Sequence, residues 1–253
     1  MFGFQSRHSS PAVRPDHIEL MVAGEPCRVT LRRSERAKRL TLRLSNASGA
    51  IILTMPARCS LASAVDFAHR HVGWMEMRLK KLPERTPFAQ GAIIPVRGIA
   101  HRIEHRPKAR KAVWVEAAAK GDNEAGLALC VCGEPAHISR RIGDYLKTEA
   151  KRDLHAAVAH HAGQIGKPVK KITLRDTRSR WGSCSSRGSL NFSWRLIMAP
   201  AYVLDYLAAH EVAHLVHMDH SARFWKLAAE LSPEWQKAEA WLKTHGARLH
   251  HFG

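Results

Sequence analysis

The sequence lacks the features that mark membrane, secreted and disulfide-stapled proteins. It has no run of about 18 apolar residues, the length that a membrane-spanning helix needs. Its opening stretch, MFGFQSRHSSPAVRPDH, has no continuous apolar segment of the kind that a signal peptide carries. We therefore expect a soluble cytoplasmic protein without a membrane partner.

Cysteine is scarce, and its pattern is not one of pairs. The sequence contains five cysteines, an odd number, and no two of them form a CxxC pair. Such a scattered set suits a reducing compartment, where thiols pack as small apolar side chains. The five positions are Cys27, Cys59, Cys130, Cys132 and Cys184.

Acidic residues are few relative to basic ones. The chain has 22 Asp and Glu against 40 Lys and Arg, a formal net charge of +18. Residues 1–120 hold 22 basic and 9 acidic side chains, whereas residues 121–253 hold 18 and 13. A charge of this size attracts polyanions such as nucleic acid, although no aromatic-rich nucleic-acid motif accompanies it. Two interpretations stay open: a nucleic-acid partner for the basic amino-terminal half, or a solvated basic face.

What the sequence does contain is a metal-binding pattern. HEVAHLVHMDHSARFW, residues 210–225, opens with His-Glu-x-x-His. On a helix, His210 and His214 project from one face and can hold one metal ion, while Glu211 is placed to take a proton from water. A catalytic zinc ion usually has three protein ligands. His220 follows His214 by six residues, the separation of the longer HExxHxxGxxH pattern, and is the expected third ligand.

The surroundings of this pattern favour a metal site over coincidence. Coincidence is the alternative because the chain has 17 histidines. However, Pro200 can start a helix in which apolar residues recur at helical spacing, and two histidines and a glutamate beside such a stripe are costly to bury without a partner. The glycine of the longer pattern is replaced by His217, so the helix must end in another way, through Met218 and Asp219.

The order of elements predicts an α+β fold in three parts. A flexible lead over residues 1–15 precedes a β-rich region with one helix over residues 16–135, and residues 136–253 hold the metal-binding helix. The first strands predict a meander, and no internal repeat is visible. We expect strands at 27–32, 39–45, 50–56, 92–98, 99–105, 112–117, 126–133, 170–176 and 189–196, and further helices at 61–82, 137–163, 221–231 and 233–245.

Several stretches resemble a known family. SRWGSCSSRGSLNFSWRL and APAYVLDYLAAHEVAHLVHMDHSARFW are similar to the YgjP-like metallopeptidase family, which is related to SprT-like and Wss1-like zinc proteases. RRSERAKRLTLRLS, the strand that ends in MPAR, and FAHRHVGWMEMRL resemble the leader region of the same family. The resemblance implies a zincin-type α+β peptidase domain over residues 136–253, behind the β-rich amino-terminal region.

Carried over position by position, the resemblance implies one zinc ion per chain. His210, His214 and His220 would be its ligands, and Glu211 would be the general base. The resemblance also implies a peptide or protein substrate. The segment Arg180–Cys184 matches the family, but the motif alone assigns it no chemical role.

Candidate contacts with a substrate, or with the negative oxygen of a transition state, lie near the pattern in sequence. They are Arg178, Arg180, Trp181, Tyr202, Tyr206 and His217. A turn-anchoring cation and a core aromatic are equal alternatives for Arg180 and Trp181, and an exposed residue at a helix end is the alternative for His217. Asp219 can either hold a ligand histidine or cap the next helix.

The substrate is less well indicated. An exposed strand at residues 189–196 would let an extended peptide add by main-chain hydrogen bonds, and a nucleic-acid tether would restrain such an enzyme. Two other functions stay open: a zinc-dependent hydrolase of a non-peptide bond, and a nucleic-acid-associated metal-binding protein. Glu211 argues against the second, because a structural zinc site needs four closed ligands and no such glutamate. No oligomeric state is indicated.

Overall fold

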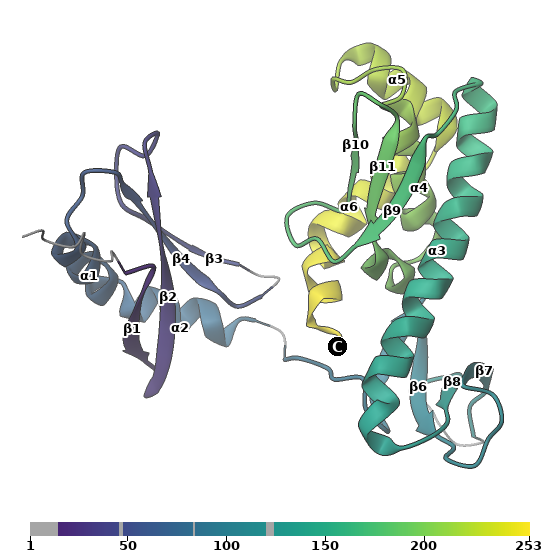
Figure 1. The fold of residues 1–253 in the computed structure, drawn as a ribbon, viewed down its shortest axis with the longest axis horizontal. Helices are drawn as coiled ribbons and strands as arrows, with labels where there is room; N and C mark the ends of the chain where they lie inside the picture. Colours follow the sequence, from purple (N-terminus) through teal and green to yellow (C-terminus); the bar gives the residue numbers. More distant parts are fainter. Residues whose placement is uncertain (1–14, 46–47, 83, 120–123) are drawn as a thin grey trace, which may run out of the picture. The chain divides into compact units, whose positions relative to one another are not determined.

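The computed structural model describes residues 15–45, 48–82, 84–119 and 124–253, and the chain divides into two compact units, Met1–Leu82 and Pro83–Gly253 (Figure 1). Apart from Pro15, the flexible lead that we predict lies outside the described residues. No helix within the described ranges is long and apolar enough to cross a membrane.

The first unit contains a four-stranded sheet. Its strands are β1 (His17–Val22), β2 (Glu25–Ser34), β3 (Thr41–Leu44) and β4 (Ile51–Pro56). They pair in the order β1-β2-β4-β3, with β4 parallel to β2 and antiparallel to β3, so the predicted meander is wrong. Alternation along β4, where Ile51, Leu53 and Met55 are fully buried, shows which face of the strand meets the core. It does not show which strands are its neighbours.

Two helices, α1 (Leu61–Arg70) and α2 (Val72–Lys80), follow where the sequence predicts one helix over 61–82. Ser60 caps α1 as expected, because its hydroxyl accepts a hydrogen bond from a backbone N–H of the first turn. The helix breaks at His71, whose φ of −109° and ψ of 14° are not helical.

The second unit begins with another four-stranded sheet. Its strands are β5 (Ile93–Val96), β6 (Ile99–His105), β7 (Val113–Ala117) and β8 (Leu127–Val131). They pair in the order β5-β6-β8-β7, with the same strand directions as the first sheet. Both sheets close their first hairpin through two residues with positive φ, Ala23-Gly24 and Arg97-Gly98. The chain thus repeats one topology, which is invisible in the sequence because it lies in strand order and not in residue identity.

A long helix, α3 (Ile138–Ile165), joins this sheet to the rest of the second unit. Its buried residues pack in one core with apolar residues of β6, β8 and the later helices. Arg97 in the hairpin turn also forms ion pairs with Glu149 and Asp153 of α3, at 2.8 and 2.7 Å. The chain therefore divides between residues 82 and 83, whereas the sequence places the boundary between 135 and 136.

The remainder of the second unit is a three-stranded sheet with helices beside it (Figure 1). The elements are β9 (Lys171–Arg175), β10 (Gly182–Cys184), β11 (Ser189–Ser193), α4 (Ala201–Ala213), α5 (Ala222–Leu231) and α6 (Trp235–His245), with 3-10 turns at Pro135–His137, Trp194–Met198 and Gly246–His251. The strand order is β10-β11-β9, with β11 parallel to β9 and antiparallel to β10. β10 escapes prediction because three residues are too few to show an alternation. The predicted α+β fold class is confirmed.

Candidate metal centre

Helix α4 carries the His-Glu-x-x-His pattern into the interior of the second unit. It begins after Pro200, as the sequence predicts, and it is buried on nearly all sides. His210 and His214 lie one turn apart on one face, and their ring centres are 5.0 Å apart. The helix ends at Ala213 with His214 as its C-cap residue, so the second histidine stands where the chain turns away.

The turn after α4 brings the chain back to this face. The Nδ1 atom of His214 lies 2.9 Å from the His217 carbonyl, and this hydrogen bond orients the ring. Asp219 accepts a hydrogen bond from the Ser221 N–H at 3.2 Å, which makes it part of the entry to α5 rather than a support for a histidine. Residues 214–221 are all described and none has a positive φ, so no position in this turn requires glycine.

The third histidine of the pattern meets the first two. The Nε2 atom of His220 lies 3.2 Å from that of His210, and one ring nitrogen of His210, His214 and His220 lies within 4.8 Å of the others. Phe224 of α5 stacks on His214 with ring centres 4.4 Å apart and meets the other two rings at 4.9 and 4.8 Å. The three rings are therefore held in place by packing as well as by the turn.

Burial shifts the pKa values of three residues of the HExxH pattern. It lowers the pKa of His210 to about 4, helped by the other two histidines, and it also lowers the pKa of His214. Neutral imidazoles carry the lone pair that a metal ion binds. Burial raises the pKa of Glu211 to about 8, whereas the charge of Arg180 lowers it.

The residue types at this site fit a bound metal ion. Glu211 is only 4% exposed, and its Oε2 atom has no hydrogen-bond partner among the described residues. A buried carboxylate oxygen without a partner is costly, which indicates that a further group belongs beside it. Three imidazoles next to such a carboxylate fit a divalent transition-metal ion.

The Arg-Trp-Gly-Ser-Cys segment packs directly against Glu211. Gly182 is so close that a Cβ atom there would overlap Oε1 of Glu211 and lie 2.8 Å from its Cγ and Cδ. Beside it, Trp181 stacks on His250 with ring centres 4.9 Å apart, which favours the core-aromatic alternative. Gly182 is thus a site residue that sequence reasoning misses. Its only signal is a glycine inside a segment that matches the family closely.

The other predicted contact residues lie in different surroundings. Tyr206 is buried, and its hydroxyl lies 3.4 Å from Nδ1 of His210, where it supports the ring. Tyr202 lies beneath a lysine, whose ammonium is 4.5 Å from the ring centre. Arg178 and Arg180 are exposed on the link between β9 and β10. Of these residues, Tyr206 contacts a histidine of the cluster, and Arg180 lowers the pKa of Glu211 through its charge.

The strand expected to receive a peptide is not an open edge. Residues 189–193 form β11, which pairs with β9 on one side and β10 on the other, and a 3-10 turn follows it. The expectation for this strand is therefore wrong, because both of its rows of main-chain hydrogen-bonding groups are already used. The edge beside Glu211 is β10, and no other described strand pairs with its outer side.

Comparison with known proteins gives two findings. A family model described as "YgjP-like, metallopeptidase domain" matches residues 38–245, which is more than half of the chain. Part of the chain resembles the crystal structure of the metallopeptidase zymogen of Pyrococcus abyssi abylysin, with a TM-score of 0.34 and 20% identity, over 36% of this chain and 92% of that chain. No curated protein matches the sequence.

Proposed function

The chain belongs to the YgjP-like metallopeptidase family, and we propose that it is a zinc-dependent peptidase whose single zinc ion is held by His210, His214 and His220. One observation carries this proposal: three ring nitrogens lie within 4.8 Å of one another beside a buried carboxylate with an unpaired oxygen. Catalytic zinc sites typically have three protein ligands and an open fourth position.

In this proposal Glu211 moves the protons. A zinc ion held by neutral ligands supplies a positive charge that polarises the scissile carbonyl and acidifies water. Beside that positive charge the ionised form of Glu211 is favoured despite its burial. Glu211 can then take a proton from the attacking water on a carboxylate oxygen and later deliver it to the leaving amine. Gly182 supports this role, because its missing side chain leaves the carboxylate the space it occupies.

Arg180 is our candidate for stabilising negative charge on the substrate. It is exposed, and its charge lowers the pKa of the neighbouring Glu211. A cation aimed at the oxygen that becomes negative lowers the barrier to attack on an amide. Tyr206 holds the ring of His210 in place. Trp181 stacks instead on His250, and within the described ranges neither Trp181 nor Arg178 contacts His210, His214 or His220.

The substrate that this arrangement fits is an extended peptide. β10 presents its outer edge next to Glu211, and a peptide paired with that edge would pass the three histidines. Main-chain hydrogen bonds give such binding little dependence on side chains. We therefore propose unfolded or extended protein segments as substrates.

The test is to compare the wild type with Glu211→Gln on an unfolded protein substrate. We expect Glu211→Gln to retain its zinc and to cut about 100- to 10,000-fold more slowly, which is the contribution of general acid–base catalysis. Glu230→Gln, which changes an exposed glutamate of α5, is the matched control and should cut like the wild type.

Equal cleavage by the wild type and Glu211→Gln would contradict the assignment. Zinc binding without any peptide cleavage, together with hydrolysis of a small ester that Glu211→Gln abolishes, would support the alternative hydrolase of a non-peptide bond.

A further inference from the structure

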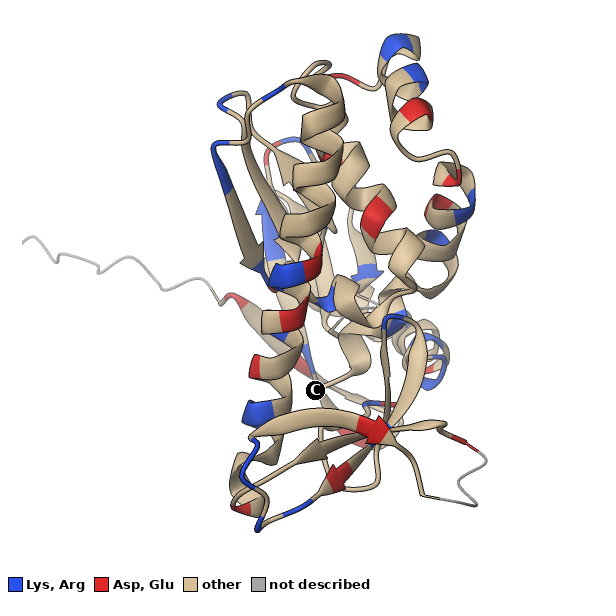
Figure 2. Ribbon diagram, turned by 90° about the vertical axis from the view of Figure 1, so that its right-hand side faces the viewer, with Lys and Arg blue, Asp and Glu red and all other residues tan. Residues whose placement is uncertain are grey.

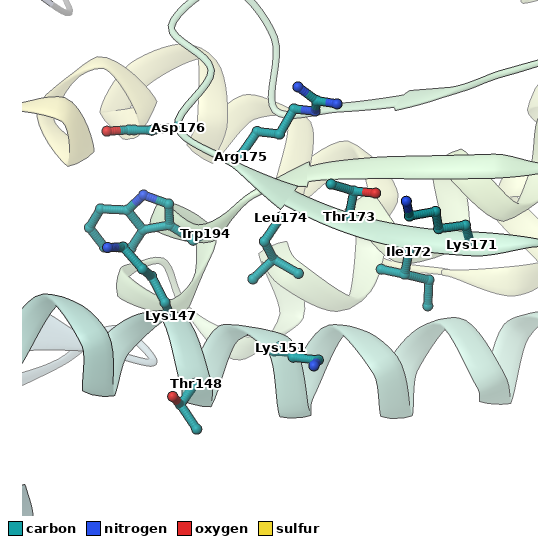
Figure 3. Close-up of a pocket in the computed structure, with 10 residues that line it drawn as sticks. All are labelled: Lys147, Thr148, Lys151, Lys171, Ile172, Thr173, Leu174, Arg175, Asp176 and Trp194. Carbon is teal, nitrogen blue, oxygen red and sulfur yellow. The ribbon is translucent and has the colours of Figure 1, made fainter.

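A second surface of the same sheet has the form of a binding groove. It has a volume of about 520 Å³ and lies between β9 and α3 (Figure 3). All five residues of β9 line one side, and Lys147, Thr148 and Lys151 of α3 line the other. Trp194 closes one end. The groove lies at the opposite edge of the sheet from β10 and therefore does not belong to the histidine cluster.

The β9 side of the groove offers an unpaired main chain. β9 pairs with β11 on its inner side, and no strand among the described residues pairs with its outer side. Ile172 and Leu174 point toward α3, whereas Thr173 lies on the other side of the strand (Figure 3). An unpaired strand edge above an apolar floor is a template for a further extended chain.

The groove is also strongly basic. Lys147, Lys151, Lys171 and Arg175 are exposed around it, and the last two are the first and last residues of β9. Figure 2 marks the basic and acidic residues on the ribbon. Lys147 has Asp144 at 3.6 Å. Within the described ranges no carboxylate forms an ion pair with the other three cations.

The single carboxylate of the lining does not neutralise these cations. Asp176 is held by Arg195, whose Nε and Nη2 atoms lie 2.6 and 3.1 Å from its two oxygens. Asp176 is therefore already paired with a residue behind the groove. The groove itself presents an excess of positive charge to a ligand.

The spacing of the two lysines on α3 matches that of a strand. Lys147 and Lys151 are four residues apart, so they lie on one face of the helix with a rise of about 6 Å between them. Every second side chain of an extended peptide points the same way, and such side chains are about 6.6 Å apart. β9 runs alongside α3, so carboxylates at alternate positions of a peptide on β9 would meet both lysines (Figure 3).

We propose that this groove binds an acidic protein segment in extended conformation, as a fourth strand on β9, with Asp or Glu at alternate positions facing Lys147 and Lys151. Nucleic acid fits less well. Trp194 is only 6% exposed and offers no face on which a base could stack, and phosphates do not complement a row of alternating N–H and C=O groups. The proposal does not depend on the peptidase assignment.

The test measures binding of a labelled peptide in which Glu alternates with Val to the full chain carrying Glu211→Gln, which prevents cleavage. We expect the double variant Lys147→Gln/Lys151→Gln to weaken binding about fivefold or more, since two partly exposed ion pairs are lost. Lys108→Gln/Lys111→Gln removes the same charge from the exposed link between β6 and β7, and should change the affinity less than about twofold.

A second measurement separates strand pairing from charge attraction. Two isomeric peptides carry N-methyl groups on alternate residues, either the even or the odd set. Only one set of N–H groups can face β9, so we expect one isomer to bind like the parent and the other to lose about tenfold or more in affinity. Equal binding of both isomers would overturn the proposal. The same affinity loss in Lys147→Gln/Lys151→Gln and in Lys108→Gln/Lys111→Gln would also overturn it. So would displacement of the peptide by an oligonucleotide of the same charge at equal concentration.

Discussion

β10 and β9 are the two outer strands of one three-stranded sheet, and each lies beside a different helix. β10 lies beside α4, where Gly182 leaves space for a buried carboxylate. β9 lies beside α3, where exposed lysines line an open groove. The difference follows from the helices: α4 is apolar on nearly all sides and takes its few polar groups into the interior, whereas α3 presents a polar face to water. On our two proposals, one sheet thus offers a site for chemistry at β10 and a site for binding at β9.

The largest effect is expected from Gly182→Ala, which disturbs the contact between β10 and Glu211. The new Cβ would overlap the Glu211 carboxylate, which is buried and cannot move freely. We expect kcat to fall about 30-fold, equivalent to about 2 kcal/mol, through displacement of the general base. Gly143→Ala, at a glycine of α3 with no atom within 4 Å of the added Cβ, is the control and should leave kcat unchanged. An unaffected Gly182→Ala enzyme would contradict the role given to this contact.

A smaller effect is expected from Tyr206→Phe on α4. The change removes the hydroxyl that lies 3.4 Å from Nδ1 of His210 and leaves the ring packing intact. Loss of a residue that supports a metal ligand costs about 10- to 100-fold in affinity, and a contact this long should lie below that range. We expect zinc affinity to fall about threefold, measured by competition with a chelator of known affinity. A loss above about 100-fold would mean that Tyr206 does more than orient the ring.

The smallest effect is expected when the groove beside β9 is altered and the cleavage activity is measured. Lys147→Gln/Lys151→Gln should change the cleavage rate of a short neutral peptide less than about twofold, because these lysines lie outside the histidine cluster and surface charges interact weakly through water. The measurement is kcat/KM beside that of the wild type. A large loss of activity would show that the two edges are not independent.

Local patterns account for what the sequence predicts well. The helix that carries His210 and His214 follows from apolar spacing and Pro200, and the position of His220 follows from a known spacing of residues close in the chain. These features are set by neighbours within about three turns, which a sequence displays directly. The three histidines do lie together in the structure, whereas their role as zinc ligands stays a prediction.

Contacts between distant segments account for what the sequence does not predict. The boundary after Leu82 depends on a core that joins β6 and β8 to α3, and the edge position of β10 depends on which strands pair with β11. Neither pairing is written into the period of any one segment. The approach of Gly182 to Glu211 is of the same kind, because the two residues lie on different elements. A nucleic-acid partner for the basic amino-terminal half likewise stays a prediction.

The most direct test of the metal centre is to measure the number of zinc ions bound per chain and their affinity, by competition with a chelator, in the wild type, His220→Ala and His217→Ala. His217 is the matched control, because only its carbonyl contacts another histidine of the turn. We predict about one zinc ion for the wild type and His217→Ala, and binding at least about 100-fold weaker for His220→Ala, since a ligand contributes more than the residues that support it. Equal zinc affinity in all three proteins, or no zinc in any of them, would contradict the account.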